Sequence, residues 1–178
     1  MDDQEQSLLL DALLYEQGHP RRTQHILKVY ALARLLGEEE KMGKEERTVL
    51  NAAAILHDIP IRYCKIHCQG DAGQENQRKA APRLVEEFLT RAGYPAQDVP
   101  QVVELVKRHH DYSGSQGGLL GLLIEADLIV NCYETDPAPE QMEVWKGLFR
   151  SEAGKALLDA YLQGAAVRTA GREKTPAV

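Results

Sequence analysis

The sequence is poor in cysteine and in aromatic residues, and it has no long apolar segment. Three cysteines are an odd number, so a framework of disulfides is not expected. No apolar run approaches the roughly 20 residues that a membrane-spanning helix needs. Phe, Trp and Tyr make up 6% of the chain, which leaves few rings on which nucleic-acid bases could stack. We therefore expect neither a disulfide-rich secreted domain, nor a membrane protein, nor a nucleic-acid platform.

Positive charge is also scarce. The chain has 21 Lys and Arg against 27 Asp and Glu, which gives a net charge of −6. A surface that coats nucleic acid would need clustered Lys and Arg, so this class of partner is not expected. A small anionic substrate is compatible with the charge, because a bound cation can invert the local field. The segment from Met1 to Glu5 is acidic and unlike a signal peptide, so we expect a cytoplasmic protein.

The spacing of apolar residues predicts an all-α protein. Apolar positions recur every three to four residues through most of the chain, and no alternating strand pattern or internal repeat is evident. We predict a single-domain helical globule of about seven helices over residues 1–168, and a disordered tail over 169–178. Four of the predicted helices span residues 44–57, 74–92, 99–110 and 119–133. Residues 64–73 and 113–118 are predicted loops, and Pro60 is expected to end regular structure after the first of these helices.

Polar residues stand inside or at the ends of these apolar helices. His57 and Asp58 follow directly after the apolar run 52–56, and burying both is costly unless a partner such as a divalent cation satisfies them. Further residues of this kind are His25, His109, His110 and Asp127. Each has an alternative explanation when taken alone: a histidine can be a hydrogen-bonded core residue, Asp58 can cap a helix, and Asp127 can pair with Arg34 or Arg108. Their joint occurrence favours one metal site.

The order His…His-Asp…Asp resembles the HD-domain superfamily of metal-dependent phosphohydrolases. The resemblance runs from His25 to Glu134, and residues 29–33, 53–59 and 125–129 carry it together with His25. It implies a helical HD fold in which four residues bind a metal ion: His25, His57, Asp58 and Asp127. Residues 73–82 and 131–134 are similar to a subgroup of small, uncharacterised bacterial HD proteins whose substrate is not settled.

The resemblance implies one or two divalent ions. Members with two ions commonly add a His pair from one helix, and His109–His110 matches that position. A further His or Glu often precedes this pair, and here Glu75, which opens the helix after the predicted loop, is the first candidate and His67 is the second. Imidazole and carboxylate ligands together suit Mn²⁺, Fe²⁺, Co²⁺, Ni²⁺ or Zn²⁺ better than Mg²⁺.

By the same resemblance, the expected activity is metal-dependent hydrolysis of a small phosphorylated substrate. The substrate would be a phosphomonoester or a phosphodiester, with nucleotides among the candidates. Asp58 would bind metal and position the attacking water, so it is the expected catalytic residue. The expected phosphate-binding cations are Arg22, Lys28 and Lys79. A di-iron oxygenase of HD fold and a metal- or nucleotide-binding regulator with little turnover share these ligands and stay open, as does assembly into a homodimer.

Overall fold

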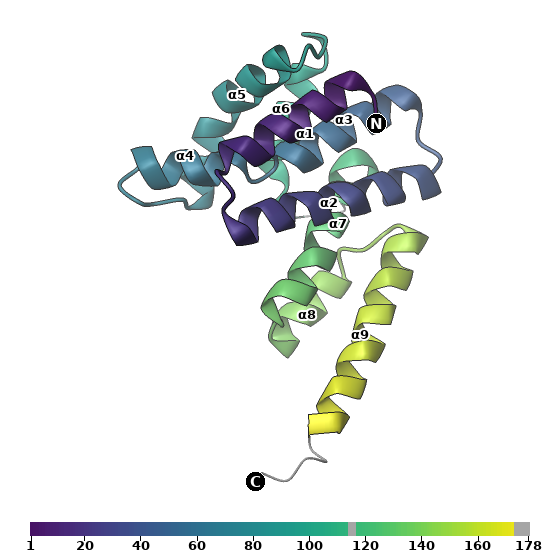
Figure 1. Cartoon of the computed structure of the whole chain (residues 1–178). Helices are drawn as coiled ribbons and strands as arrows, with labels where there is room; N and C mark the ends of the chain where they lie inside the picture. Colours follow the sequence, from purple (N-terminus) through teal and green to yellow (C-terminus); the bar gives the residue numbers. More distant parts are fainter. Residues whose placement is uncertain (114–116, 173–178) are drawn as a thin grey trace.

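The structure of the chain, a computed structural model, describes the backbone of residues 1–113 and 117–172 and the side chains of these ranges up to residue 164. Within these ranges it contains nine helices and no strand, which confirms the all-α prediction. The helices are α1 (Asp3–Tyr15), α2 (Pro20–Glu39), α3 (Lys44–Leu56), α4 (Ile59–His67), α5 (Gln74–Arg91), α6 (Val99–Arg108), α7 (Gly118–Thr135), α8 (Pro139–Lys146) and α9 (Glu152–Arg172). Figure 1 shows α1 to α6 gathered in one bundle, from which α7 leads towards α8 and α9. No helix in the described part of the chain is long and apolar enough to cross a lipid bilayer.

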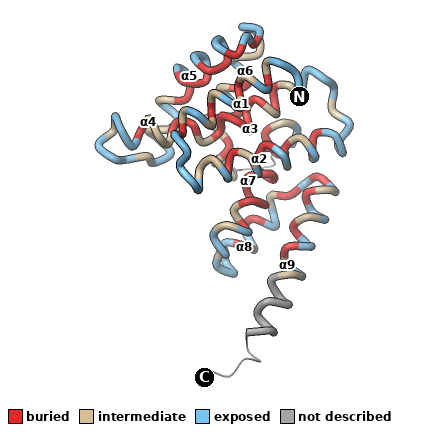
Figure 2. Tube along the Cα trace, in the orientation of Figure 1, coloured by how far each residue is buried: buried red, intermediate tan, exposed pale blue. Residues whose placement is uncertain are grey.

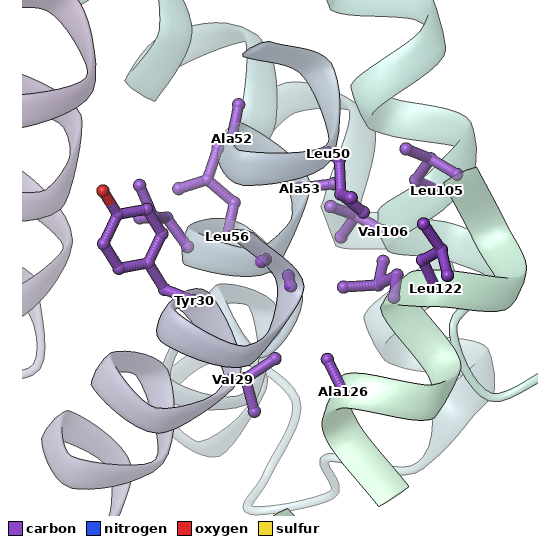
Figure 3. Close-up of a cluster of buried hydrophobic side chains, with 14 of the residues drawn as sticks. Val29, Tyr30, Leu50, Ala52, Ala53, Leu56, Leu105, Val106, Leu122 and Ala126 are labelled. Carbon is purple, nitrogen blue, oxygen red and sulfur yellow. The ribbon is translucent and has the colours of Figure 1, made fainter. Parts of the chain in front are cut away.

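The core is centred on α3 and α7. Every residue from Ala52 to Leu56 in α3 is fully buried, and α3 packs against α1, α2, α6 and α7. Three successive alanines at 52–54 have small side chains, which lets the neighbouring helices approach closely. Figure 3 shows this contact, with Val29 from α2 and Ala126 from α7 beside α3. In α7 every residue at positions 120–130 is buried, so this part of the helix is enclosed on all sides (Figure 2).

Pro60 does not end regular structure, so that prediction is wrong. Helix α4 begins at Ile59 and has Pro60 in its first turn. A proline is tolerated there because the first N–H groups of a helix have no intrahelical acceptor. Helix α4 continues to His67, so helix replaces the first part of the predicted loop 64–73. This additional helix is one reason why the described ranges hold nine helices rather than about seven.

Hydrogen bonds to a buried carboxylate connect the residues just before α9 to α7. Glu125 on α7 is 1% exposed, and its Oε1 accepts hydrogen bonds from the backbone N–H of Arg150 (2.6 Å) and of Ser151 (3.0 Å). The Ser151 hydroxyl donates to Oε2 of the same carboxylate. Gly154 lies against this carboxylate, where a Cβ would collide with it. Helix α9 then runs to Arg172. Residues 173–178 of the predicted tail and 114–116 of the predicted loop lie outside the described residues.

Candidate metal centre

Four polar side chains meet in the interior of the bundle. His25 comes from α2 and Asp127 from α7, while His57 and Asp58 connect α3 to α4. His25 Nε2 is 3.2 Å from His57 Nε2 and 3.1 Å from Asp127 Oδ1. Asp58 Oδ2 is 3.7 Å from His25 Nε2 and 3.6 Å from His57 Nε2. Ligand atoms stand about 2–2.6 Å from a bound ion, so all four side chains are close enough to share one.

The turn between α3 and α4 brings adjacent residues to this point. His57 keeps helical backbone angles at the end of α3. Asp58 has φ −101° and ψ 0°, a sparsely populated conformation in which active-site residues are often found. The chain changes direction there, so the side chains of both residues reach the same cluster. The side chain of His57 is fully buried, whereas that of Asp58 is 17% exposed.

A second group of potential ligands shares Asp58. His109 and His110 follow directly after α6, and one ligand atom from each lies within 4.8 Å of the other and of an Asp58 oxygen. The same limit holds for the group of His25, His57 and Asp58. His109 Nε2 is buried 3.7 Å from Asp58 Oδ1 and makes no hydrogen bond to the described residues. A metal ion would satisfy this nitrogen, which otherwise is a buried polar atom without a partner.

The orientation of two histidine rings also fits metal binding. His57 Nδ1 lies 2.8 Å from the carbonyl oxygen of Ala54, and His109 Nδ1 lies 2.7 Å from that of Val106. A carbonyl oxygen can only accept a hydrogen bond, so Nδ1 carries the proton in both rings. In the neutral imidazole the opposite nitrogen, Nε2, then has a free lone pair. In both rings this nitrogen faces Asp58.

Two polar residues that the sequence analysis did not select support the cluster from α7. The Asn131 side-chain amide donates to Asp127 Oδ1 (2.9 Å), and Glu134 Oε2 lies 3.1 Å from His25 Nδ1. Asp127, Asn131 and Glu134 stand at positions i, i+4 and i+7, which share one face of a helix. That spacing is the sequence signal by which both could have been found.

Burial and charge together favour a cation in this cluster. Burial alone would raise the pKa of both Asp58 and Asp127, but the histidines around them hold the pKa of each carboxyl below its ordinary value. Burial lowers the pKa of His57, which keeps this ring neutral. Burial also tends to lower the pKa of His25, yet the hydrogen bond to Asp127 and the charge of Asp58 outweigh it and raise this pKa to about 9. Two ionised carboxylates beside imidazole nitrogens form a typical donor set for a transition-metal ion.

The raised pKa of His25 predicts how the metal-free protein responds to pH. Its folded-state pKa of about 9 exceeds the ordinary 6.5, so the stability that it contributes is complete below pH 6.5 and is lost as the pH rises through 9. The loss should be of the order of 1–3 kcal/mol in the free energy of unfolding. Urea unfolding in the presence of a chelator, at pH 6.5 and at pH 9, measures it. The loss of stability between the two pH values should be much smaller in His25→Gln than in wild type. It should be unchanged in His19→Gln, which replaces an exposed histidine. An equal loss in wild type and in both variants would contradict the assignment to His25.

The structure does not bring Glu75 or Lys79 to the cluster. The side chain of Glu75 is 82% exposed at the start of α5, and Lys79 donates a hydrogen bond to it at 2.6 Å. The turn of α5 that carries both residues faces solvent, so the two side chains pair with each other on the surface. The expectation of Glu75 as a metal ligand and of Lys79 as a substrate contact is corrected accordingly.

A pocket of about 320 Å³ opens above the cluster. It is lined by His19, Arg21, Arg22, His25, Asp58, Ile61, His110, Asp127, Asn131 and Glu134. Arg22, an expected phosphate ligand, forms a hydrogen bond and an ion pair with the buried Glu16. Lys28, the other such residue near the cluster, donates to Glu134 Oε1 at 2.9 Å. Arg21 is 66% exposed at the pocket rim, where its Nε lies 3.9 Å from Glu134.

Comparison with known proteins agrees with this geometry. A family model described as the HD domain matches residues 22–143, which include each of the histidines and aspartates of the cluster. Searches of curated proteins and of solved structures found no significant match. The matched segment covers more than half of the chain and begins in α2 and ends in α8, so it spans every helix that contributes to the cluster. The chain therefore belongs to the HD-domain family.

Proposed function

We propose that this HD-domain protein hydrolyses a small phosphorylated substrate, a phosphomonoester or a phosphodiester, with the help of one or two divalent ions. The observation that carries the proposal is the position of Asp58. Its carboxylate belongs to both groups of potential ligands and also lines the pocket. A substrate that enters the pocket would therefore reach the carboxylate that both ion positions share. HD-domain proteins are mostly metal-dependent hydrolases, which supports the same reaction class.

The residues divide into two sets of ligands. His25, His57, Asp58 and Asp127 would hold the first ion, and Asp58 with His109 and His110 would hold a second. When bound, a divalent ion would supply the acidity that activates a water and would screen the charge of the phosphate. Mn²⁺, Fe²⁺, Co²⁺, Ni²⁺ and Zn²⁺ match these nitrogen and oxygen donors.

The polar side chains in and around the pocket would bind and orient the attacking water, the substrate and the metal ligands. Asp58 is an ionised carboxylate that lines the pocket and has access to solvent, so it is placed to hold the attacking water. Arg21 lies at the rim and has five N–H donors, which suits it to bind a phosphate as the substrate enters. Asn131 holds Asp127 in place through its amide. The pocket volume of about 320 Å³ favours a small substrate over a polymer.

A screen for phosphate release tests the proposal. Purified protein is incubated with Mn²⁺, Ni²⁺ or Fe²⁺ and a panel of phosphomonoesters, phosphodiesters and nucleotides. We expect release from at least one substrate class that depends on the added metal and is absent in Asp58→Ala. The proposal would be wrong if wild type and Asp58→Ala gave the same signal. Oxygen consumption by an iron-loaded sample, or tight nucleotide binding without product, would indicate the oxygenase or the regulator instead.

A further inference from the structure

We propose that Glu134 is a positioning residue of the metal centre, which holds His25 through Nδ1 and so fixes Nε2 as a metal ligand. This inference rests on the proposed function, because it concerns the same centre. Glu134 lies in the last turn of α7, seven residues after Asp127. One helix would therefore supply both a ligand of the centre and the support of a second ligand.

The contacts place Glu134 behind the His25 ring rather than in the cluster. Glu134 Oε2 is 3.1 Å from Nδ1 of His25, whereas Nε2 of the same ring is 3.1 Å from Asp127 Oδ1. The two nitrogens point away from each other across the imidazole, so one faces Glu134 and the other faces the remaining ligands. The Glu134 side chain is 11% exposed, which limits competition from water for its hydrogen bond.

His25 differs in this respect from the other buried histidines. His57 and His109 donate from Nδ1 to backbone carbonyl oxygens. A carboxylate is a stronger acceptor than a carbonyl, and it makes the ligating nitrogen more basic while it fixes the tautomer. Loss of Glu134 should therefore weaken one ligand selectively and leave the backbone supports of the other rings in place.

Lys28 extends this support to the surface. Its Nζ donates to Glu134 Oε1 at 2.9 Å, on the carboxylate oxygen that does not contact His25. The ammonium group thus holds the carboxylate in the orientation that His25 needs. Lys28 was expected to bind substrate, and this contact gives it the role of holding Glu134 instead. Because Lys28 is 50% exposed, its removal should have a smaller effect than removal of Glu134.

Metal affinity, measured without any substrate, tests the role of Glu134. Calorimetric titration of metal-free protein with Mn²⁺ should give a dissociation constant about 10- to 100-fold higher in Glu134→Ala than in wild type. Glu134→Gln should fall between the two, since its amide oxygen still accepts a hydrogen bond, and Lys28→Met should show a smaller increase. The control is Glu143→Ala, which removes an exposed carboxylate that is likewise paired with a lysine, Lys146. Equal dissociation constants in wild type, Glu134→Gln and Glu134→Ala would overturn the proposal.

A second measurement separates failure of this inference from failure of the proposed function. Nitrogen NMR of the metal-free protein reports the hydrogen bonding and the solvent exchange of the proton on His25 Nδ1. We expect this proton to be hydrogen-bonded and slow to exchange with water in wild type, and to exchange faster in Glu134→Ala. If wild type bound no metal, the proposed function would fail while the NMR comparison would still test the positioning of His25. An unchanged His25 signal in Glu134→Ala would overturn the inference even if metal binding were normal.

Discussion

Replacing Asp58 with asparagine is expected to lower kcat/KM for metal-dependent phosphate release by at least about 10³-fold, because metal-based charge stabilisation contributes several kcal/mol. Asp58 is the side chain whose oxygens approach both groups of histidines, at 3.6 Å from His57 Nε2 and 3.7 Å from His109 Nε2. The asparagine keeps the shape of the side chain but removes its charge and one of its two oxygen acceptors. One ion position would therefore lose its Asp58 ligand, and the other would keep only an uncharged amide oxygen in its place.

A matched control keeps this result interpretable. Asp159→Asn changes an exposed carboxyl on α9 and should leave kcat/KM within a factor of two or so of wild type. Thermal unfolding of the metal-free proteins should show that both variants remain folded. Full activity in Asp58→Asn, with metal content equal to that of wild type, would show that the catalytic centre lies elsewhere.

Replacing Glu125 with alanine is expected to lower the free energy of unfolding by about 3 kcal/mol. The substitution removes the acceptor of two backbone N–H groups, those of Arg150 and Ser151, and of the Ser151 hydroxyl. Since Glu125 and Ser151 are buried, the substitution leaves buried hydrogen-bond donors without their acceptor. Urea unfolding followed by circular dichroism measures the change.

Two companion variants sharpen the Glu125 experiment. Gly154→Ala should also destabilise the protein, because its Cβ would collide with the Glu125 carboxylate. Glu86→Ala, at an exposed position of α5, should stay within about 0.5 kcal/mol of wild type. If Glu125→Ala were no less stable than Glu86→Ala, the hydrogen bonds to Arg150 and Ser151 would not hold α9 against α7.

Much of this structure could be predicted from the sequence because its strongest signals are local. The helical period of apolar residues indicates the elements directly, and the burial of α3 follows from the unbroken apolar run before His57. The candidate ligands could be selected because each is a costly polar group in such a helix. His25, His57, Asp58 and Asp127 are brought together by the packing of α3 against α2 and α7.

The errors arose where tertiary placement decides the outcome. Glu75 has the right chemistry for a ligand, but the packing of α5 turns it to solvent, and no local pattern encodes that choice. Pro60 is compatible with two outcomes, because a proline suits the first turn of a new helix as well as the end of the preceding one. Glu134 was missed because a glutamate near the exposed end of a helix looks like a surface residue until α2 places His25 beside it.

The distance along the chain between the ligands has a consequence for the lifetime of the folded state. His25 and Asp127 are 102 residues apart in sequence, yet their ligand atoms are 3.1 Å apart in space. A cation bound between them would act as a reversible cross-link that closes more than half of the chain into a loop. Such a cross-link cannot persist in the unfolded chain, so metal binding adds to the free energy of unfolding, and it slows unfolding to the extent that the ligands separate before the transition state. In this fold the cation that takes part in the chemistry would also slow the unfolding of the chain.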